Sequence, residues 1–256
     1  LEEQGFVEDA SVFTWYVDRN GGVEIVPGYY QLRHNDHMGN VLARLRTPPD
    51  QTFQRVTFPE GFTVQQMAER LAEEQPRLSV DAFLAAANSP EVRSRFRPPG
   101  VTSLEGLLFP DTYQVSNAYN EGQVVERMVT LMERVADQED IEEVAASMGR
   151  SPYEILIIAS IIEKEAKLDV DRPKIARVIY NRLFIPMPLQ IDATVYYGQD
   201  RSIPFPQLRQ IDTPYNTYLH EGLPPTPIAN PGRASIRAAL HPAPNPPAGD
   251  PLCQVL

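Results

Sequence analysis

Cysteine is almost absent from this sequence, and histidine is scarce. Cys253 is the one cysteine among 256 residues, which excludes a disulfide within the chain and a cysteine-based zinc site. It either pairs with a cysteine outside this chain or stays an unpaired thiol. His34 and His37 are spaced as His-x-x-His, but no further ligand lies near them in the sequence. We therefore predict no metal site.

The sequence also lacks an excess of positive charge and a long apolar run. Its 34 acidic residues outnumber its 23 lysines and arginines, so the net charge is −11. Because phosphate binding needs a basic face, this charge argues against a nucleic-acid partner. No apolar run reaches the roughly 18–20 residues of a membrane span. Leu1 lies within a helix-like pattern, so we expect the chain to be part of a longer protein.

Proline is in excess, with 25 in the chain, roughly twice the usual share. The prolines cluster in the last third, among Asn, Gln, Thr and Tyr residues. Proline-stiffened loops of this composition present fixed amide, hydroxyl and aromatic groups, which suit a carbohydrate ligand. A long structural loop with Asx turns is the alternative.

Residues 1–100 combine strand and helix patterns. We expect a β-type segment at Val23–Leu32, an amphipathic helix at Met38–Leu45 and a strand at Phe53–Phe58. The segment Gly61–Leu71 then opens with a capping box and continues as an amphipathic helix. This pattern is similar to LysM, a small glycan-binding module, and a purely structural role is the alternative.

A break at Pro98-Pro99-Gly100 interrupts the patterns. We therefore predict one domain over residues 1–100 and a second over residues 101–256. The expected fold class is α+β, with a small LysM-like α/β module at the N-terminus. A mixed helical catalytic domain with long proline-rich loops would follow it.

Residues 151–165 carry the most informative helix pattern. Ser151 and Glu154 form a capping box, and 155–162 is apolar on nearly every side, which predicts a buried helix. Glu163 and Glu165 follow, and at about 100° per residue they point about 200° apart. Glu165 lies on the more apolar face, where a carboxyl keeps its proton and can act as a general acid. A solvated helix end is the alternative.

Four stretches stand out as motifs, and the last of them is long and unusual in composition: Glu105–Tyr113, Ala159–Glu165, Leu189–Gly198 and Pro214–Gly232. In these stretches the chain resembles the endolytic murein transglycosylases, the MltG/YceG-like family. The match covers most of residues 101–243 and, more loosely, residues 23–75, where the family has a LysM-like part. Leu107 replaces a common aromatic residue, Ala166 replaces Ser or Thr, and Thr226 replaces Gly.

The resemblance implies an activity and a location. The enzyme would cut nascent peptidoglycan strands internally between N-acetylmuramic acid and N-acetylglucosamine, leaving 1,6-anhydro ends and so terminating or releasing chains. It would be a single-pass cell-membrane protein, anchored by an N-terminal helix that precedes this chain, with its catalytic part on the periplasmic or cell-wall side. No cofactor is implied, and partners would be glycan strands and cell-wall synthesis proteins. Because the family continues past His241-Pro242 with a closing segment, we expect the catalytic domain to be truncated here.

The resemblance also selects the site residues. The family's catalytic glutamate is followed directly by Ser or Thr, a position that corresponds to Glu165, with Glu163 as the second candidate. One carboxyl suffices for this reaction, because the substrate's own N-acetyl and 6-hydroxyl groups take the other roles. The expected substrate-binding residues are Gln190, Asn216 and Tyr218, followed by Asp192, Thr194 and Tyr215.

Two other functions compete with this one. A two-carboxylate muramidase would use Glu165 with Asp192 or Glu163 and would release reducing ends. A non-catalytic peptidoglycan-binding scaffold of cell-wall synthesis would leave the strands intact.

Overall fold

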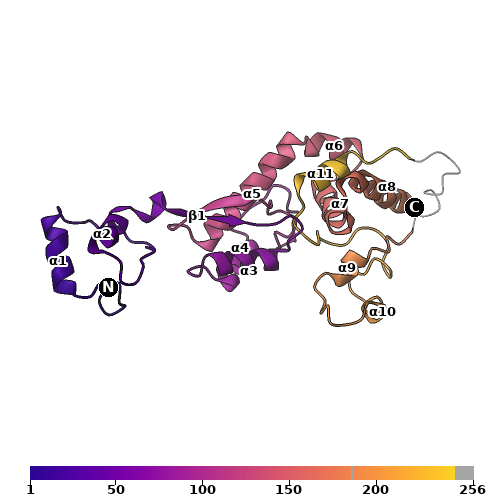
Figure 1. The fold of residues 1–256 in the computed structure, drawn as a ribbon. Helices are drawn as coiled ribbons and strands as arrows, with labels where there is room; N and C mark the ends of the chain where they lie inside the picture. Colours follow the sequence, from indigo (N-terminus) through magenta and orange to yellow (C-terminus); the bar gives the residue numbers. More distant parts are fainter. Residues whose placement is uncertain (186, 246–256) are drawn as a thin grey trace. The chain divides into compact units, whose positions relative to one another are not determined.

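The computed structural model describes residues 1–185 and 187–245, so Cys253 lies outside the described residues. The described residues form mostly helices together with a two-stranded sheet (Figure 1), which agrees with the expected α+β class. Within these residues, no helix combines the length and the apolar content needed to cross a membrane.

The chain forms two compact units. The first contains residues 1–56 and 112–120, and the second contains residues 57–111 and 121 onward. The chain therefore passes from one unit to the other at residues 56, 111 and 120, and no unit boundary falls near residue 100.

The first unit has its core between two helices. Phe13 of α1 packs with Val41 and Leu45 of α2. Val23–Leu32, expected to be a β-type segment, forms no strand, and some of its apolar side chains pack against this core instead. The elements of this unit are α1 (Ala10–Arg19), α2 (Met38–Arg46), the 3-10 helix η1 (Pro49–Gln51), β1 (Phe53–Thr57) and β2 (Thr112–Ser116).

The strands β1 and β2 run antiparallel. Just before β1, the carbonyl of Thr52 accepts the N–H of Asn117, which lies just after β2, at 3.0 Å. The strand expected at Phe53–Phe58 is therefore confirmed, and its partner is a segment some 60 residues later in the chain.

The second unit opens with two capped helices. Thr63 and Gln66 form the expected capping box of α3, and the Ser79 hydroxyl accepts the Ala82 N–H at the start of α4. The helices of this unit are α3 (Val64–Glu74), α4 (Val80–Ala87), α5 (Glu121–Gln138), α6 (Ile141–Ser147), α7 (Pro152–Glu165), the 3-10 helix η2 (Asp169–Asp171), α8 (Arg172–Phe184), α9 (Asp192–Tyr196), α10 (Phe205–Leu208) and α11 (Arg233–Leu240).

Helix α7 forms the centre of the second unit. Every residue of 155–162 is buried, and Ser151 and Glu154 form the predicted capping box at the start of the helix. It contacts α6, α8, α9 and α11, so neighbours cover it on several sides (Figure 1). A helix that is apolar all round can be stable only in such a position, and its C-terminal glutamates are therefore held in fixed places.

The division of the chain differs from the one expected at residue 100. Helices α3 and α4 pack on each other, and α4 packs on α5, so residues 57–111 share a core with the rest of the second unit. The segment around Pro98 is tied back to α4, since the Leu104 N–H donates to the Ala87 carbonyl at 3.0 Å. A Pro-Pro-Gly sequence is a turn here and not a linker.

Replacing Ile158 by aspartate tests the burial of α7. Ile158 is 0% exposed, so Ile158→Asp places an unpaired carboxylate in the core and should cost several kcal/mol of unfolding free energy, about 3–5. Ile158→Val is the matched control and should cost about 0.5–1.5 kcal/mol. Urea unfolding measures both, and an unchanged midpoint for Ile158→Asp would contradict the assignment.

Limited proteolysis distinguishes the two divisions of the chain. The Arg97 guanidinium donates to the carbonyls of Ser89, Val92 and Thr102 at 2.9–3.1 Å, so residues 98–102 should resist a protease of broad specificity. Arg97→Ala removes these contacts and should open the segment to cleavage. Early cleavage of the unmodified protein at 98–102, seen by mass spectrometry, would support a domain boundary at residue 100.

Candidate functional site

The two glutamates at the end of α7 have different partners. The Glu163 side chain is 7% exposed; its Oε1 lies 3.2 Å from the Arg172 guanidinium, and its Oε2 accepts the Gly232 N–H at 3.0 Å. Glu163 therefore ties α7 to the starts of α8 and α11. Glu165 Oε1 instead accepts the N–H of Ala193, at the start of α9, at 3.3 Å. The separation expected from helical spacing is present.

A cavity of about 440 Å³ lies beside Glu165. Gln190 and Asp192 line it with Glu165, and Arg182 contributes a further polar side chain. The remaining wall is apolar and is formed by Ile175, Val178, Ile179, Leu189 and Ile191. The cavity thus combines two carboxyls, an amide, a guanidinium and an apolar surface, which a sugar ring with its hydroxyls can match.

The pKa of Glu165 is raised. Burial of the carboxyl is the largest cause, although the residue as a whole is exposed. The Ala193 N–H lowers the pKa, and the nearby Asp192 carboxylate raises it further. The net upward shift lets Glu165 keep its proton at a higher pH than a free glutamate, as a general acid requires.

Tyr218 is positioned at Asp192. Its hydroxyl donates to Asp192 Oδ1 at 2.6 Å, and the Arg209 guanidinium lies 5.1 Å from the centre of its ring. Burial and the bond to Asp192 raise the pKa of Tyr218 to about 12, so the phenol stays protonated and Asp192 keeps its donor. The expected residues Tyr218 and Asp192 therefore lie together with Glu165.

Two of the predicted substrate-binding residues are buried and form their hydrogen bonds within the protein. Asn216 is buried, and its Nδ2 donates to the carbonyls of Arg209 and Ile211 at 2.9 and 2.8 Å. Thr194 is buried as well, and its hydroxyl donates to the Ile191 carbonyl at 2.7 Å. We therefore correct their assignment: both hold the loops around the cavity, because no polar atom of either is presented to a ligand.

Of the other two predicted substrate-binding residues, Gln190 lines the cavity beside Glu165, whereas Tyr215 contacts other loops. Gln190 is exposed in the cavity wall with a φ of 51°, and its N–H donates to the Thr217 carbonyl at 2.9 Å. Tyr215 shares a hydrogen bond with the Thr226 hydroxyl at 2.7 Å, and its ring centre lies 4.7 Å from that of Tyr197. Gln190 thus remains a candidate substrate contact, whereas Tyr215 is engaged with other loops.

The site also contains a buried carboxyl that was not among the predicted residues. Glu105 is 4% exposed and accepts hydrogen bonds from the Val64 N–H at 3.2 Å, the Tyr197 hydroxyl at 3.1 Å and Asn230 Nδ2 at 3.0 Å. It thereby joins the start of α3 to the loop after α9 and the loop before α11. Burial, the largest cause, raises the pKa of Glu105 to about 7, against the lowering effects of the Val64 and Gly106 backbone donors, the Tyr197 hydroxyl and the Lys164 charge.

The sequence contained one signal for Glu105, namely a single carboxyl followed by a glycine within an apolar run. In the structure, Gly106 has a φ of 78°, a conformation that favours glycine. A Cβ at position 106 would lie 2.3 Å from the ring of Pro227. A lone carboxyl before a glycine that another loop approaches this closely indicates a buried contact, and not a surface turn.

Stability should depend on pH through Glu105. Because the folded pKa of about 7 exceeds the unfolded value of 4.5, the folded state binds more protons between these values, so stability falls as pH rises from about 4.5 to 7. The full difference is about 3 kcal/mol of unfolding free energy. Glu105→Gln keeps the shape and should remove this component, as measured by urea unfolding at pH 5 and pH 8. Equal pH dependence in both proteins would contradict it.

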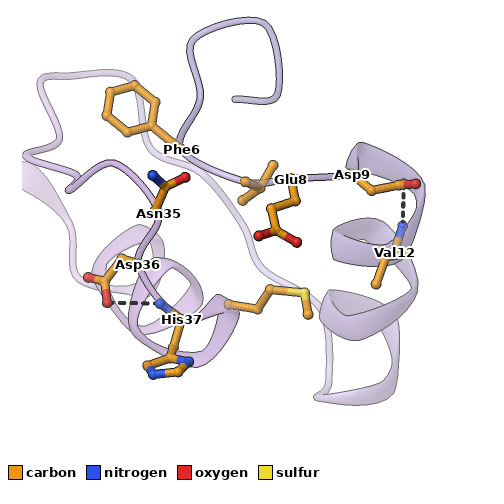
Figure 2. Close-up of a pocket in the computed structure, with 9 residues that line it drawn as sticks. Phe6, Glu8, Asp9, Val12, Asn35, Asp36 and His37 are labelled. Carbon is orange, nitrogen blue, oxygen red and sulfur yellow. Dashed lines mark hydrogen bonds between the residues drawn. The ribbon is translucent and has the colours of Figure 1, made fainter.

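The first unit has a cavity of its own, of about 350 Å³ (Figure 2). Its acidic side chains serve the local backbone: Asp9 accepts the Val12 N–H, and Asp36 accepts the His37 N–H. His34 stacks on Phe6 with ring centres 4.6 Å apart. Across the described residues, no three His, Cys, Asp or Glu side chains are placed to hold a metal ion.

Known proteins resemble this chain over most of its length. A relative in Bacillus subtilis named endolytic murein transglycosylase is 31% identical over 94% of this chain and 71% of its own length. A relative of the same name in Streptococcus pneumoniae is 28% identical, and this chain spans 49% of its length. The crystal structure of a yceG-like protein from Listeria monocytogenes matches with a TM-score of 0.69 and 32% identity, covering 96% of this chain and 85% of that one. The model of the YceG-like family matches residues 1–247, and the chain belongs to that family.

Proposed function

We propose that this chain is a lytic transglycosylase of peptidoglycan, with Glu165 as its acid and base. The observation that carries the proposal is the Glu165 carboxyl, with its raised pKa, at the edge of a cavity with an apolar wall. The names of the relatives support the same activity.

The reaction needs one protein carboxyl. Glu165 donates its proton to the glycosidic oxygen as the bond from N-acetylmuramic acid C1 to that oxygen breaks. The substrate's N-acetyl carbonyl stabilises the positive charge at C1. The Glu165 carboxylate then removes the proton from the 6-hydroxyl, O6 bonds to C1, and a 1,6-anhydro ring forms. The glutamate ends protonated, ready for another cycle.

Other residues orient the substrate in this scheme. Gln190 and Asp192 share the cavity with Glu165 and would bind sugar hydroxyls, and Tyr218 holds Asp192 through its 2.6 Å hydrogen bond. Glu163 takes no part, because its oxygens are occupied by Arg172 and Gly232.

A muramidase is the second candidate, and the position of Asp192 favours it. Asp192 and Glu165 line one cavity, as the acid and the second carboxylate of a hydrolase do. We place it second because Asp192 Oδ1 already accepts the Tyr218 hydroxyl in a 2.6 Å hydrogen bond, so this oxygen is not free to act on a water or on C1 of the sugar.

The glycan-binding part of the proposal concerns the segment Gly61–Leu71, which holds the capping box and most of α3. We propose that this segment is part of a LysM-like module that binds the same strands. Since peptidoglycan lies outside the cell membrane, we also propose that the chain works on that side, in a membrane-anchored protein beside the enzymes of wall synthesis.

Three substitutions test the catalytic assignment. Glu165→Gln cannot donate and then accept a proton, so cleavage of purified glycan strands should fall by at least about 10²–10⁴-fold with binding and melting temperature retained. Asp192→Asn should raise KM more than it lowers kcat. Glu163→Gln should chiefly lower stability, because it removes the buried carboxylate that pairs with Arg172 and leaves only the exposed Asp169 as an ion-pair partner.

The products decide between the candidate reactions. Mass spectrometry should find 1,6-anhydro ends, whereas reducing ends would show a muramidase and intact strands a binding protein. Equal losses in Glu165→Gln and Asp192→Asn would favour the muramidase. An active Glu165→Gln with an inactive Glu163→Gln would move the site to Glu163. Comparison with the full-length protein controls for activity that depends on segments beyond this chain.

A further inference from the structure

A second cavity, of about 310 Å³, lies next to the one at Glu165. Ala193 lines it, and the N–H of this residue contacts Glu165. Lys164, which precedes Glu165 on α7, also lines it. Residues adjacent in the sequence therefore line the two cavities: Lys164 and Glu165 at the end of α7, and Asp192 and Ala193 at the start of α9.

The second cavity carries positive charge in an acidic protein. Lys164 and Arg201 line it, and in the part of the chain that the structure describes neither forms an ion pair. Lys164 Nζ bonds only a backbone carbonyl, that of Gly61, at 3.2 Å, and the Arg201 guanidinium lies 5.8 Å from the Tyr196 ring centre. Both cations keep donors that a ligand could use.

The carboxyls that lie near this cavity are engaged with other partners. Glu105 lines it, but its side chain is buried, and its oxygens already accept the Val64 N–H, the Tyr197 hydroxyl and Asn230 Nδ2. Glu163 neighbours Lys164 in sequence but already pairs with Arg172. Burial and the charge of Arg201 lower the pKa of Lys164, while the charges of Glu163 and Glu105 raise it, and the net shift is downward. An anion between Lys164 and Arg201 would therefore stabilise both charges.

We propose that the cavity lined by Lys164 and Arg201 binds a carboxylate of the glycan substrate and so fixes which sugar lies at Glu165. The inference rests on the proposed function. Muramyl residues are the acidic sugars of these strands, whereas N-acetylglucosamine has no carboxyl. A cationic cavity beside the acid therefore gives the site a means of distinguishing the two sugars.

The carboxylate has two sources. In strands with stem peptides, the lactyl group is an amide and the free carboxylates belong to the peptide. In strands without peptides, the lactyl carboxylate itself is free. Both present the same chemistry to Lys164 and Arg201, and the experiment separates them.

The test measures binding in a Glu165→Gln background, where strands stay intact. Three preparations are compared by fluorescence titration: peptide-bearing strands, the same strands with peptide carboxyls amidated, and peptide-free strands. Arg201→Ala should weaken binding by about fivefold, the upper range for an exposed ion pair, for the preparation that presents the recognised carboxylate. Arg201→Lys should restore most of the lost affinity. Arg134→Ala removes an exposed arginine on α5 and is the matched control.

Each outcome has a defined meaning. A loss confined to unamidated peptide-bearing strands assigns the peptide carboxylate, and a loss confined to peptide-free strands assigns the lactyl carboxylate; either supports the proposal. Equal effects of Arg201→Ala and Arg134→Ala on all three preparations overturn it. If strands bind with this charge dependence but the unmodified protein leaves them uncut, the proposed reaction fails and the cavity assignment stands.

Discussion

The burial of α7 on nearly all sides is the constraint on which the site depends. An apolar helix of this kind must be covered by its neighbours, and α6, α8, α9 and α11 cover it. After the apolar stretch 155–162 the helix ends in Glu163, Lys164 and Glu165, so these charged groups emerge together at one end of the core. Glu163 closes an ion pair with Arg172, and Glu165 reaches the cavity beside α9.

Glu105 also holds the site in place, by hydrogen bonds and not by apolar packing. It receives donors from the start of α3, from Tyr197 and from Asn230, which belong to segments far apart in the sequence. Asn230 extends the connection, since its Oδ1 accepts the Leu108 N–H at 3.0 Å. The proline-rich loops are thus held by a buried polar network, which is costly to leave incomplete.

From the sequence alone we could predict the features that depend on hydrophobic periodicity and helix capping. The caps at Ser151 and Thr63, the buried stretch of α7 and the divergence of its two glutamates follow from local spacing, and the structure has them. Long-range contacts could not be predicted in this way. The side chain of Asn216 turned inward because carbonyls of its own loop needed donors, and the break at Pro98 proved to be a turn because α4 packs on α5.

The fixed position of Glu165 at the end of a buried helix also limits how the length of this protein can vary. One residue inserted or deleted within α7 would rotate Glu165 by about 100° and shift it by about 1.5 Å along the axis. The same change would turn apolar residues out of the core and misplace Glu163 relative to Arg172. Length variation among homologous chains should therefore accumulate in the loops that surround the cavity, so that substrate preference can diverge while the geometry of the acid stays constant.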